Sequence, residues 1–153
     1  SRHVAGIPGW MEVAKALETA QIPLPLIYGH NDLLPANFLY ANNRVWLIDF
    51  EYSAYSTAMF DLAGLSSNAG FDRHQSLELL ILYFSSNPDA GLIQALEAMQ
   101  CASLLREAMW SMVSELFLKA PGVDYAAYTA NQLDAYSARL DDYQSRYGKI
   151  AKS

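Results

Sequence analysis

Two short β-rich runs that stand close together constrain this chain more than any other feature. The runs are NFLYA (37–41) and VWLIDF (45–50), and only the turn-prone residues NNR (42–44) separate them. A connection this short forces the two runs to be antiparallel neighbours, which predicts a β-hairpin. Strands of about five residues then bring the segment before the first strand close to the segment after the second. Polar residues occupy both segments, GHNDLLPAN before the hairpin and DFEY at its end.

Helical patterns occupy most of the remaining chain. Residues 11–20 are strong helix formers, and Pro23 and Pro25 prevent that helix from continuing. The helix predicted over 89–118 is apolar almost all round, which indicates a buried central helix. We therefore expect a mainly α (α+β) fold in which one small β-hairpin carries the polar residues. The other predicted helices cover 56–70, 74–86 and 124–147, with breaks at Asn87-Pro88 and Pro121-Gly122.

Composition narrows the class of protein. With 153 residues, 52% hydrophobic and 17% charged, the chain is long enough for one globular core. Its net charge of −6 gives no electrostatic attraction for nucleic acid or an anionic membrane, and favours a cationic small-molecule partner. The single cysteine, Cys101, cannot form an internal disulfide, so we expect a cytoplasmic location. No signal peptide and no run long enough to span a membrane are visible.

Three polar residues around the hairpin match the needs of phosphoryl transfer. This reaction requires a carboxylate that orients the attacking hydroxyl and accepts its proton, together with oxygen ligands that hold Mg²⁺ against the phosphates. Asp32, followed five residues later by Asn37, can supply both from one loop. Asp49, at the far end of the hairpin, can return to the same place. Asp32 and Asn37 could instead be turn-forming or capping residues around Pro35.

HNDLLPAN followed by WLIDFEY resembles the catalytic and metal-binding segments of protein-kinase-like phosphotransferases. The match is closest to the choline/ethanolamine kinase and aminoglycoside phosphotransferase group, and it extends from about residue 25 to about 145. Asn31 stands where protein kinases have Arg, and Glu51 stands where they have Gly. The resemblance implies the fold of a kinase C-terminal lobe, with Mg²⁺ as cofactor and ATP as co-substrate.

Residue by residue, the resemblance implies the following roles. Asp32 becomes the catalytic base, while Asn37 and Asp49 become the Mg²⁺ ligands and so bind the nucleotide. His30 belongs to the catalytic loop as a support that hydrogen-bonds near the Asp49 turn and does no chemistry. Asp61 becomes the acid that steadies the catalytic loop through backbone N–H groups, although a simple acid at a helix N-terminus is a serious alternative.

The acceptor is expected to be a small molecule. Only eleven residues separate Asp49 from Asp61, so there is no room for the long activation loop that presents peptides to protein kinases. Similarity to choline kinases implies that Trp110 and Tyr128 line an ammonium pocket, where cation–π contacts contribute about 0.5–2 kcal/mol each. Glu107 stands where those kinases carry another Trp, and can contact an amine. Glu51 is either a solvated charge or a substrate contact.

The chain lacks a Gly-rich phosphate loop and a strand Lys, since Lys15 lies in a helical pattern. We therefore expect residues 1–153 to form a single C-terminal lobe without its nucleotide-covering N-terminal lobe, inactive alone and able to self-associate through an exposed cleft face. Its parts would be a leading helix and linker (1–24), the catalytic loop, hairpin and following helix (25–70), and a helical substrate-binding part (71–153).

The function expected for the parent protein is phosphorylation of an amino alcohol such as choline or ethanolamine. Alternatives that stay open are an aminoglycoside, thiamine-like or sugar acceptor, and a non-catalytic module that binds ammonium ligands. A metal-dependent hydrolase using His30, Asp32 and Asp49 ranks low, because such sites need a further cluster of His or Asp ligands.

Overall fold

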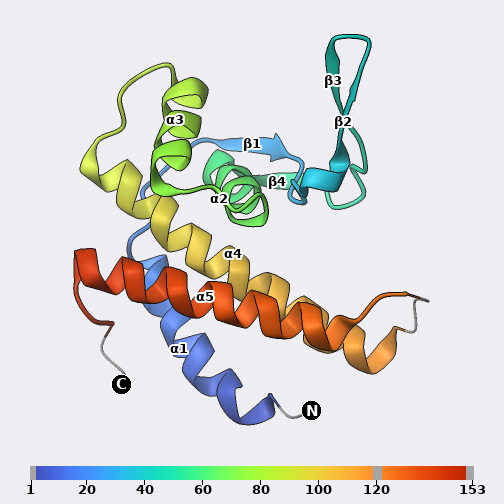
Figure 1. The fold of residues 1–153 in the computed structure, drawn as a ribbon. Coiled ribbons are helices and arrows are strands. Elements are labelled where there is room, and N and C mark those ends of the chain that lie inside the picture. Colours follow the sequence, from blue (N-terminus) through green and yellow to red (C-terminus); the bar gives the residue numbers. More distant parts are fainter. Residues whose placement is uncertain (1–2, 119–121, 151–153) are drawn as a thin grey trace. The chain divides into compact units, whose positions relative to one another are not determined.

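The computed structural model describes residues 3–118 and 122–150, which form helices and two small antiparallel sheets (Figure 1). The chain divides into a central unit, Ile22–Gln100, and a terminal unit made of Ser1–Gln21 and Cys101–Ser153. None of the helices in the described ranges is both long and apolar enough to cross a membrane.

The central unit holds all four strands and the helices that follow them. Its elements, in chain order, are β1 (Leu26–Gly29), the 3-10 turn η2 (Pro35–Asn37), β2 (Phe38–Ala41), β3 (Arg44–Leu47), β4 (Ala54–Thr57), α2 (Ala58–Asn68), α3 (Arg73–Phe84) and the first part of α4 (Ala90–Phe117). The terminal unit holds η1 (Val4–Gly6), α1 (Ile7–Glu18), the second part of α4 and α5 (Tyr125–Tyr147).

The predicted hairpin is present as β2 and β3. Phe38 pairs with Leu47 and Ala41 with Arg44, so that only Asn42 and Asn43 form the turn. Both have left-handed backbone angles, φ 51° and 59°. A two-residue hairpin turn of this kind requires φ above zero at both positions, and Asn tolerates that region better than other residues with a side chain.

The prediction of a helix from residue 56 was wrong at its start. Residues 54–57 form β4, which pairs antiparallel with β1 from Leu26–Thr57 to Gly29–Ala54, and α2 begins only at Ala58. The burial of AYST does not alternate from residue to residue as in a typical half-buried strand. Its first two residues are exposed and its last two are half-buried. Pairing with β1, about thirty residues earlier in the chain, makes this segment a strand.

The remaining helix boundaries agree with the sequence prediction to within a few residues. Asp72 caps α3 through a capping box with Gln75, in which each side chain accepts a hydrogen bond from the other residue's backbone N–H. Ser85, in the left-handed conformation, ends the helix before the predicted Asn87-Pro88 break. The end of α3 at Ser85 therefore agrees with the predicted Asn87-Pro88 break, whereas Pro121 of the second predicted break lies outside the described residues.

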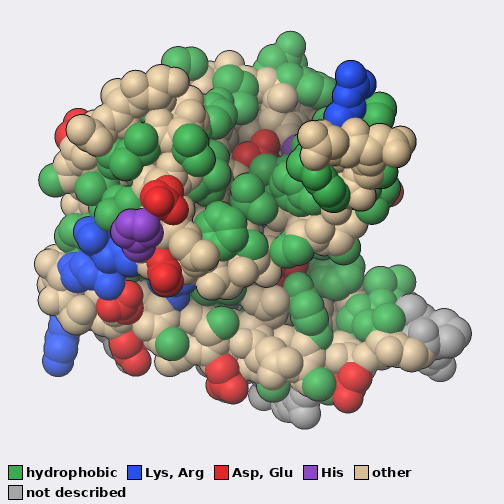
Figure 2. Space-filling view, turned by 45° about the horizontal axis from the view of Figure 1, so that its top comes forward, with side chains coloured by type: hydrophobic (Ala, Val, Ile, Leu, Met, Phe, Trp, Pro, Cys, Tyr) green, Lys and Arg blue, Asp and Glu red, His purple; other side chains and the backbone are tan. Residues whose placement is uncertain are grey.

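Helix α4 is buried along much of its length, as predicted, but its buried face is not purely apolar. Gln100 is fully buried, and its Nε2 donates to the hydroxyls of Ser66 and Ser76 at 2.8 and 3.0 Å. Glu97 is 4% exposed and accepts a hydrogen bond from Arg73 Nε at 3.0 Å. Toward its end, α4 exposes the hydrophobic residues Trp110, Val113, Leu116 and Phe117. Hydrophobic side chains are also visible at the surface in Figure 2.

The central unit has an apolar core where α2, α3 and α4 meet. Its buried members are Ala58, Met59, Leu62, Ala63, Leu80, Ala95 and Leu96. In contrast, the strands and the loops around them leave large hydrophobic side chains exposed: Leu26, Tyr28, Leu39, Tyr40, Val45, Trp46, Ile48, Phe50, Tyr52 and Tyr55. The predicted self-association through such a surface stays a prediction.

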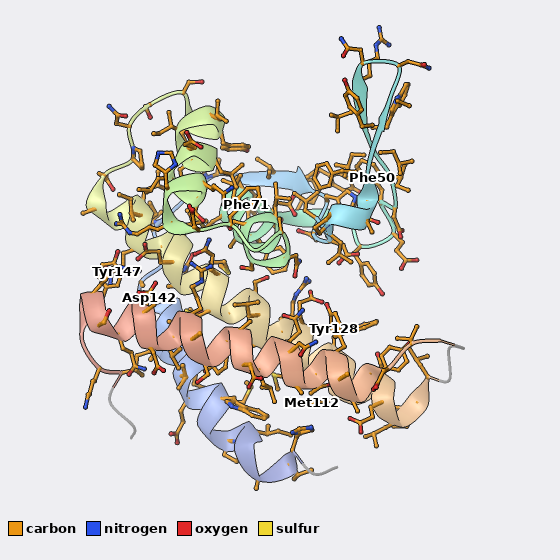
Figure 3. The ribbon with its side chains drawn as sticks, viewed as in Figure 1. Phe50, Phe71, Met112, Tyr128, Asp142 and Tyr147 are labelled. Atoms are coloured by element: carbon orange, nitrogen blue, oxygen red, sulfur yellow. The ribbon has the colours of Figure 1, made fainter. Side chains whose placement is uncertain are left out.

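The terminal unit packs aromatic residues of α5 beside α4. Tyr136 and Tyr143 are buried, and the ring of Tyr143 lies 4.9 Å from that of Tyr147, the latter labelled in Figure 3. Burial of Tyr136, followed by the nearby Cys101 thiol, raises the pKa of the phenol to about 12. Tyr136 therefore stays protonated at any physiological pH and serves packing.

We predict that Leu80→Ala lowers the free energy of unfolding by about 2–5 kcal/mol, because it opens a cavity in the core of the central unit. Leu80 is 0% exposed in α3. The matched control is Leu82→Ala, two residues further along the same helix, where the side chain is 78% exposed and the expected change is within about 0.5 kcal/mol. Urea denaturation of both variants measures the difference, and equal losses would contradict the core assignment.

Candidate active site

The loop between β1 and β2 carries Asp32. Strand β1 ends at Gly29, and Pro35 begins the 3-10 turn that leads into β2. The backbone carbonyl of Asp32 accepts two hydrogen bonds, from Leu34 N–H at 2.8 Å and from Asn37 Nδ2 at 2.9 Å. These contacts order the loop without using the Asp32 side chain. Within the described residues, the Asp32 carboxylate has no hydrogen-bond or ion-pair partner and is half-buried.

Asp61, in the first turn of α2, holds the same loop from the other side. Its Oδ2 accepts the backbone N–H of His30 at 2.8 Å, and its Oδ1 accepts that of Asn31 at 2.7 Å. Hydrogen bonds to a carboxylate are roughly twice as strong as those between neutral groups. Asp61 therefore has both predicted features: it is an acid in the first turn of a helix, and it binds backbone N–H groups of the loop.

His30 connects the loop to the end of the hairpin. It is 5% exposed, its Nε2 lies 2.9 Å from the carbonyl of Ile48, and its Nδ1 lies 3.3 Å from the backbone N–H of Asp32. This pattern fits the tautomer in which Nε2 donates and Nδ1 accepts. The ring also packs edge-on against Phe50, labelled in Figure 3, at 4.6 Å. Both ring nitrogens are engaged, which disfavours His30 as a metal ligand and with it the hydrolase alternative.

Asn37 and Asp49 are brought together by the hairpin. The backbone N–H of Ile48 donates to the carbonyl of Asn37 at 3.0 Å, so the residue before Asp49 lies against Asn37. Asn37 is 8% exposed, and because its Nδ2 donates to Asp32, its Oδ1 is left as the acceptor. Asp49 is exposed and has a left-handed φ of 65°.

This donor set fits Mg²⁺. The ion prefers hard oxygen ligands and is commonly held by one or two carboxylates, with phosphate and water oxygens completing the shell. Asn37 and Asp49 offer an amide oxygen and a carboxylate. Across residues 3–118 and 122–150, no three His, Cys, Asp or Glu side chains gather as a metal cluster. A cation here would take its remaining ligands from substrate or water.

Three of the residues predicted to bind an acceptor, Glu107, Trp110 and Tyr128, lie in the terminal unit. Glu107 is 7% exposed, its Oε1 accepts from Arg106 Nη2 at 2.5 Å, and its Oε2 lies 3.5 Å from the hydroxyl of Tyr128. Trp110, one turn further along α4, is 48% exposed, and its ring packs edge-on against Tyr125 at 6.1 Å. An acid and aromatic faces thus occur together between α4 and α5; Figure 3 labels Tyr128.

Trp110 also lines an open apolar groove. The groove, of about 480 Å³, lies between α1 and α4 and is lined by Met11, Ala14, Ala102, Leu105, Met109 and Val113 in addition to Arg106 and Trp110. The predicted contact Glu51, in the central unit, is exposed and has no hydrogen-bond or ion-pair partner within the described part of the chain.

The sequence interpretation missed several residues at the catalytic loop. Ser56 donates to Asn31 Oδ1 at 2.6 Å, and the backbone carbonyls of Tyr52 and Ala54 accept from Asn31 Nδ2 at 3.1 and 3.3 Å. The sequence interpretation treated Asn31 only as the replacement for an Arg. Its position directly before Asp32 was the available signal, but its partners lie at least 21 residues further along the chain.

Comparisons with known proteins give the relationships of the chain. The sequence model of the choline/ethanolamine kinase family matches residues 10–86, half of the chain. The Arabidopsis thaliana protein "Probable ethanolamine kinase" is 37% identical over 62 residues, which are 39% of this chain and 17% of that protein. The Dictyostelium discoideum protein "Probable ethanolamine kinase A" is 27% identical over 154 aligned residues, or 87% of this chain and 44% of that protein.

A solved structure confirms the predicted fold class. The choline/ethanolamine kinase family protein from Mesorhizobium loti superposes with a TM-score of 0.74 at 28% identity, covering 88% of this chain and 45% of that one. The chain thus spans less than half the length of these relatives. Because the family match includes Asp32, Asn37, Asp49 and Asp61, the loop–hairpin–helix arrangement described above lies within the matched region. The chain belongs to the choline/ethanolamine kinase family.

Proposed function

We propose that the protein containing this chain transfers the γ-phosphoryl group of ATP to the hydroxyl of an amino alcohol such as choline or ethanolamine. The observation that carries the proposal is the grouping of Asp32, Asn37 and Asp49 around one hairpin, held by the contacts of Asp61 and His30. Family membership supports the reaction class. Two relatives bear names that include ethanolamine kinase, which supports the acceptor class.

Asp32 is the proposed base. Its side chain has no partner among the described residues, so it can accept a hydrogen bond from the acceptor hydroxyl and take the proton as the oxygen attacks phosphorus. The loop's backbone contacts keep the carboxylate in place before the substrate arrives. Such preorganisation matters because phosphoryl transfer depends largely on positioning and on stabilising charge.

Asn37 Oδ1 and the Asp49 carboxylate are the proposed magnesium ligands. Bound Mg²⁺ would neutralise the charge that develops on the phosphate oxygens. The partly buried hydrogen bond from Asn37 Nδ2 to the Asp32 carbonyl fixes which atom of the amide faces the ion. The same bond also ties a metal ligand to the residue that carries the base.

Glu107 and its aromatic neighbours are the proposed contacts for the ammonium group of the acceptor. A carboxylate that is 7% exposed interacts with a cation more strongly than one in bulk water. The hydroxyl of Tyr128 and the rings of Trp110 and Tyr125 add polar and cation–π contacts. We also propose a cytoplasmic location, on the ground that the single cysteine, Cys101, is buried and has no second cysteine in the given sequence with which to form a disulfide.

We predict that Asp32→Asn lowers kcat by about 10²–10⁴-fold in the full-length protein, because the amide cannot accept the hydroxyl proton. The measurement is ADP formation with Mg-ATP and a panel containing ethanolamine, choline, thiamine, an aminoglycoside and a hexose. Asp141→Asn, an exposed acid of α5, is the matched control and should behave as wild type. Wild-type turnover in Asp32→Asn would refute the proposed base. If the wild-type protein bound ammonium ligands but turned over none of the acceptors, the result would favour a binding module.

We predict that Asp49→Asn raises the Mg²⁺ concentration needed for half-maximal activity by about tenfold or more, since it replaces a charged ligand with a neutral one. The test is a Mg²⁺ titration at saturating ATP and acceptor. Asp134→Asn, an exposed residue of α5, removes the same charge elsewhere and should leave the titration unchanged. Equal titration curves for Asp49→Asn and wild type would show that this carboxylate does not bind the ion.

We predict that Glu107→Gln raises KM for the amino alcohol by about tenfold or more while changing kcat little, because a charge-assisted contact to the ammonium is worth about 1.5–3 kcal/mol. Steady-state kinetics with varied acceptor measure the effect. Glu12→Gln, an exposed acid of α1 in the same unit, is the control. An unchanged KM would place the ammonium elsewhere.

A further inference from the structure

Asn31 uses its whole side-chain amide to link two segments of the central unit. Its Nδ2 donates to the backbone carbonyls of Tyr52 at 3.1 Å and Ala54 at 3.3 Å. Its Oδ1 accepts from Ser56 Oγ at 2.6 Å. The two donor hydrogens and the acceptor oxygen of the amide are therefore all engaged by residues 52–56.

The backbone of Asn31 is adapted to these contacts. Its φ is 63°, a left-handed conformation that Asn adopts more readily than most residues with a side chain. The backbone N–H of Asn31 is at the same time bound by Asp61 Oδ1 at 2.7 Å. Residues held in sparsely populated conformations persist where the surroundings over-determine them, and such residues cluster at functional sites.

Gly29 provides the space for this arrangement. A Cβ atom at this position would lie 2.6 Å from Ser56 Oγ, 2.9 Å from Asp61 Oδ2 and 3.1 Å from Asn31 Oδ1. The side chains of three residues thus converge on a buried glycine at the end of β1. This convergence places Asn31, Ser56 and Asp61 in one hydrogen-bonded cluster.

The two linked segments are direct neighbours of the proposed catalytic carboxylates. Asn31 immediately precedes Asp32, and Tyr52 is three residues after Asp49. We propose that Asn31 is a positioning residue that holds the base Asp32 and the metal ligand Asp49 in register with each other. This inference rests on the proposed function.

The chemistry of the contacts explains why a neutral amide suits the position. The side-chain amide of Asn31 meets two carbonyl acceptors and one hydroxyl donor. An aspartate would direct a second acceptor oxygen at the two carbonyls and replace attraction with repulsion. An Arg would bring five donors and no acceptor for Ser56. Among these three side chains, only asparagine satisfies all the contacts.

Asn31→Gly in the full-length protein tests the proposal. Glycine adopts the left-handed conformation without strain, so this variant removes the amide and leaves the backbone unstrained. We expect kcat to fall by about 10- to 100-fold and the half-saturating Mg²⁺ concentration to rise, while KM for the amino alcohol stays unchanged. Asn31→Asp should lose at least as much activity, and Ser56→Ala, which removes a single hydrogen bond, should give an intermediate loss.

The matched control is Asn43→Gly. Asn43 is also a left-handed asparagine, with φ 59°, but it lies at the hairpin tip, where its side chain accepts a hydrogen bond from the hydroxyl of Tyr40. Its kinetics should equal those of the wild type. Hydrogen exchange supplies a readout independent of turnover, because amides of residues 30–32 and 52–56 should exchange faster in Asn31→Gly than in Asn43→Gly.

The outcomes separate this inference from the proposed function. A wild-type protein without phosphotransferase activity would overturn both. An active wild type with unchanged kcat and Mg²⁺ dependence in Asn31→Gly would overturn the positioning role alone. A lower melting temperature with unchanged kinetics below it would show that Asn31 serves only stability, which also contradicts the proposal.

Discussion

The carboxylate of Asp61 is the contact on which the loop that carries Asp32 depends. It accepts the backbone N–H groups of His30 and Asn31, two consecutive donors that no strand or helix satisfies. A buried or half-buried N–H without a partner is costly, so the loop conformation needs such an acceptor. Because Asp61 lies in the first turn of α2, a rigid helix supplies the anchor, and the helix N-terminus in turn stabilises its negative charge.

Further hydrogen bonds connect the loop held by Asp61 to the hairpin. His30 reaches the Ile48 carbonyl, Asn37 reaches both Asp32 and Ile48, and the two-residue turn of the hairpin sets how the strands return. Each bond is a backbone or neutral side-chain contact. Among the described residues, the carboxylates of Asp32 and Asp49 take no part in these contacts, which leaves both available for the proposed chemistry.

The proposed acceptor contacts follow a different principle. Glu107 is kept in a buried position by Arg106 and the Tyr128 hydroxyl. Its aromatic neighbours are Trp110 of α4 and Tyr125 and Tyr128 of α5. A choline-type pocket made only of aromatic faces would select a quaternary ammonium by cation–π contacts. A buried carboxylate adds an acceptor for N–H donors, which favours amines that carry hydrogens.

The sequence by itself predicted the elements whose signals are local. The NNR turn between two apolar runs predicted the hairpin, and the proline-containing breaks predicted where the long helices end. The spacing of Asp32, Asn37 and Asp49 led to the proposed chemistry, because those residues lie within one hairpin of each other. Local patterns suffice there, since turns, caps and short hairpins are determined by neighbouring residues.

Only the tertiary structure decided the features that depend on distant partners. The segment 54–57 is a strand because β1 offers it hydrogen bonds, although its own sequence led to the prediction of a helix starting there. Asn31 acquires its linking role from residues 21 to 25 positions away, and Gly29 acquires its importance from the side chains of Ser56 and Asp61. The physical reason is that donors and acceptors are paired in space, so a residue's partners depend on how the whole chain folds, and no local pattern records them.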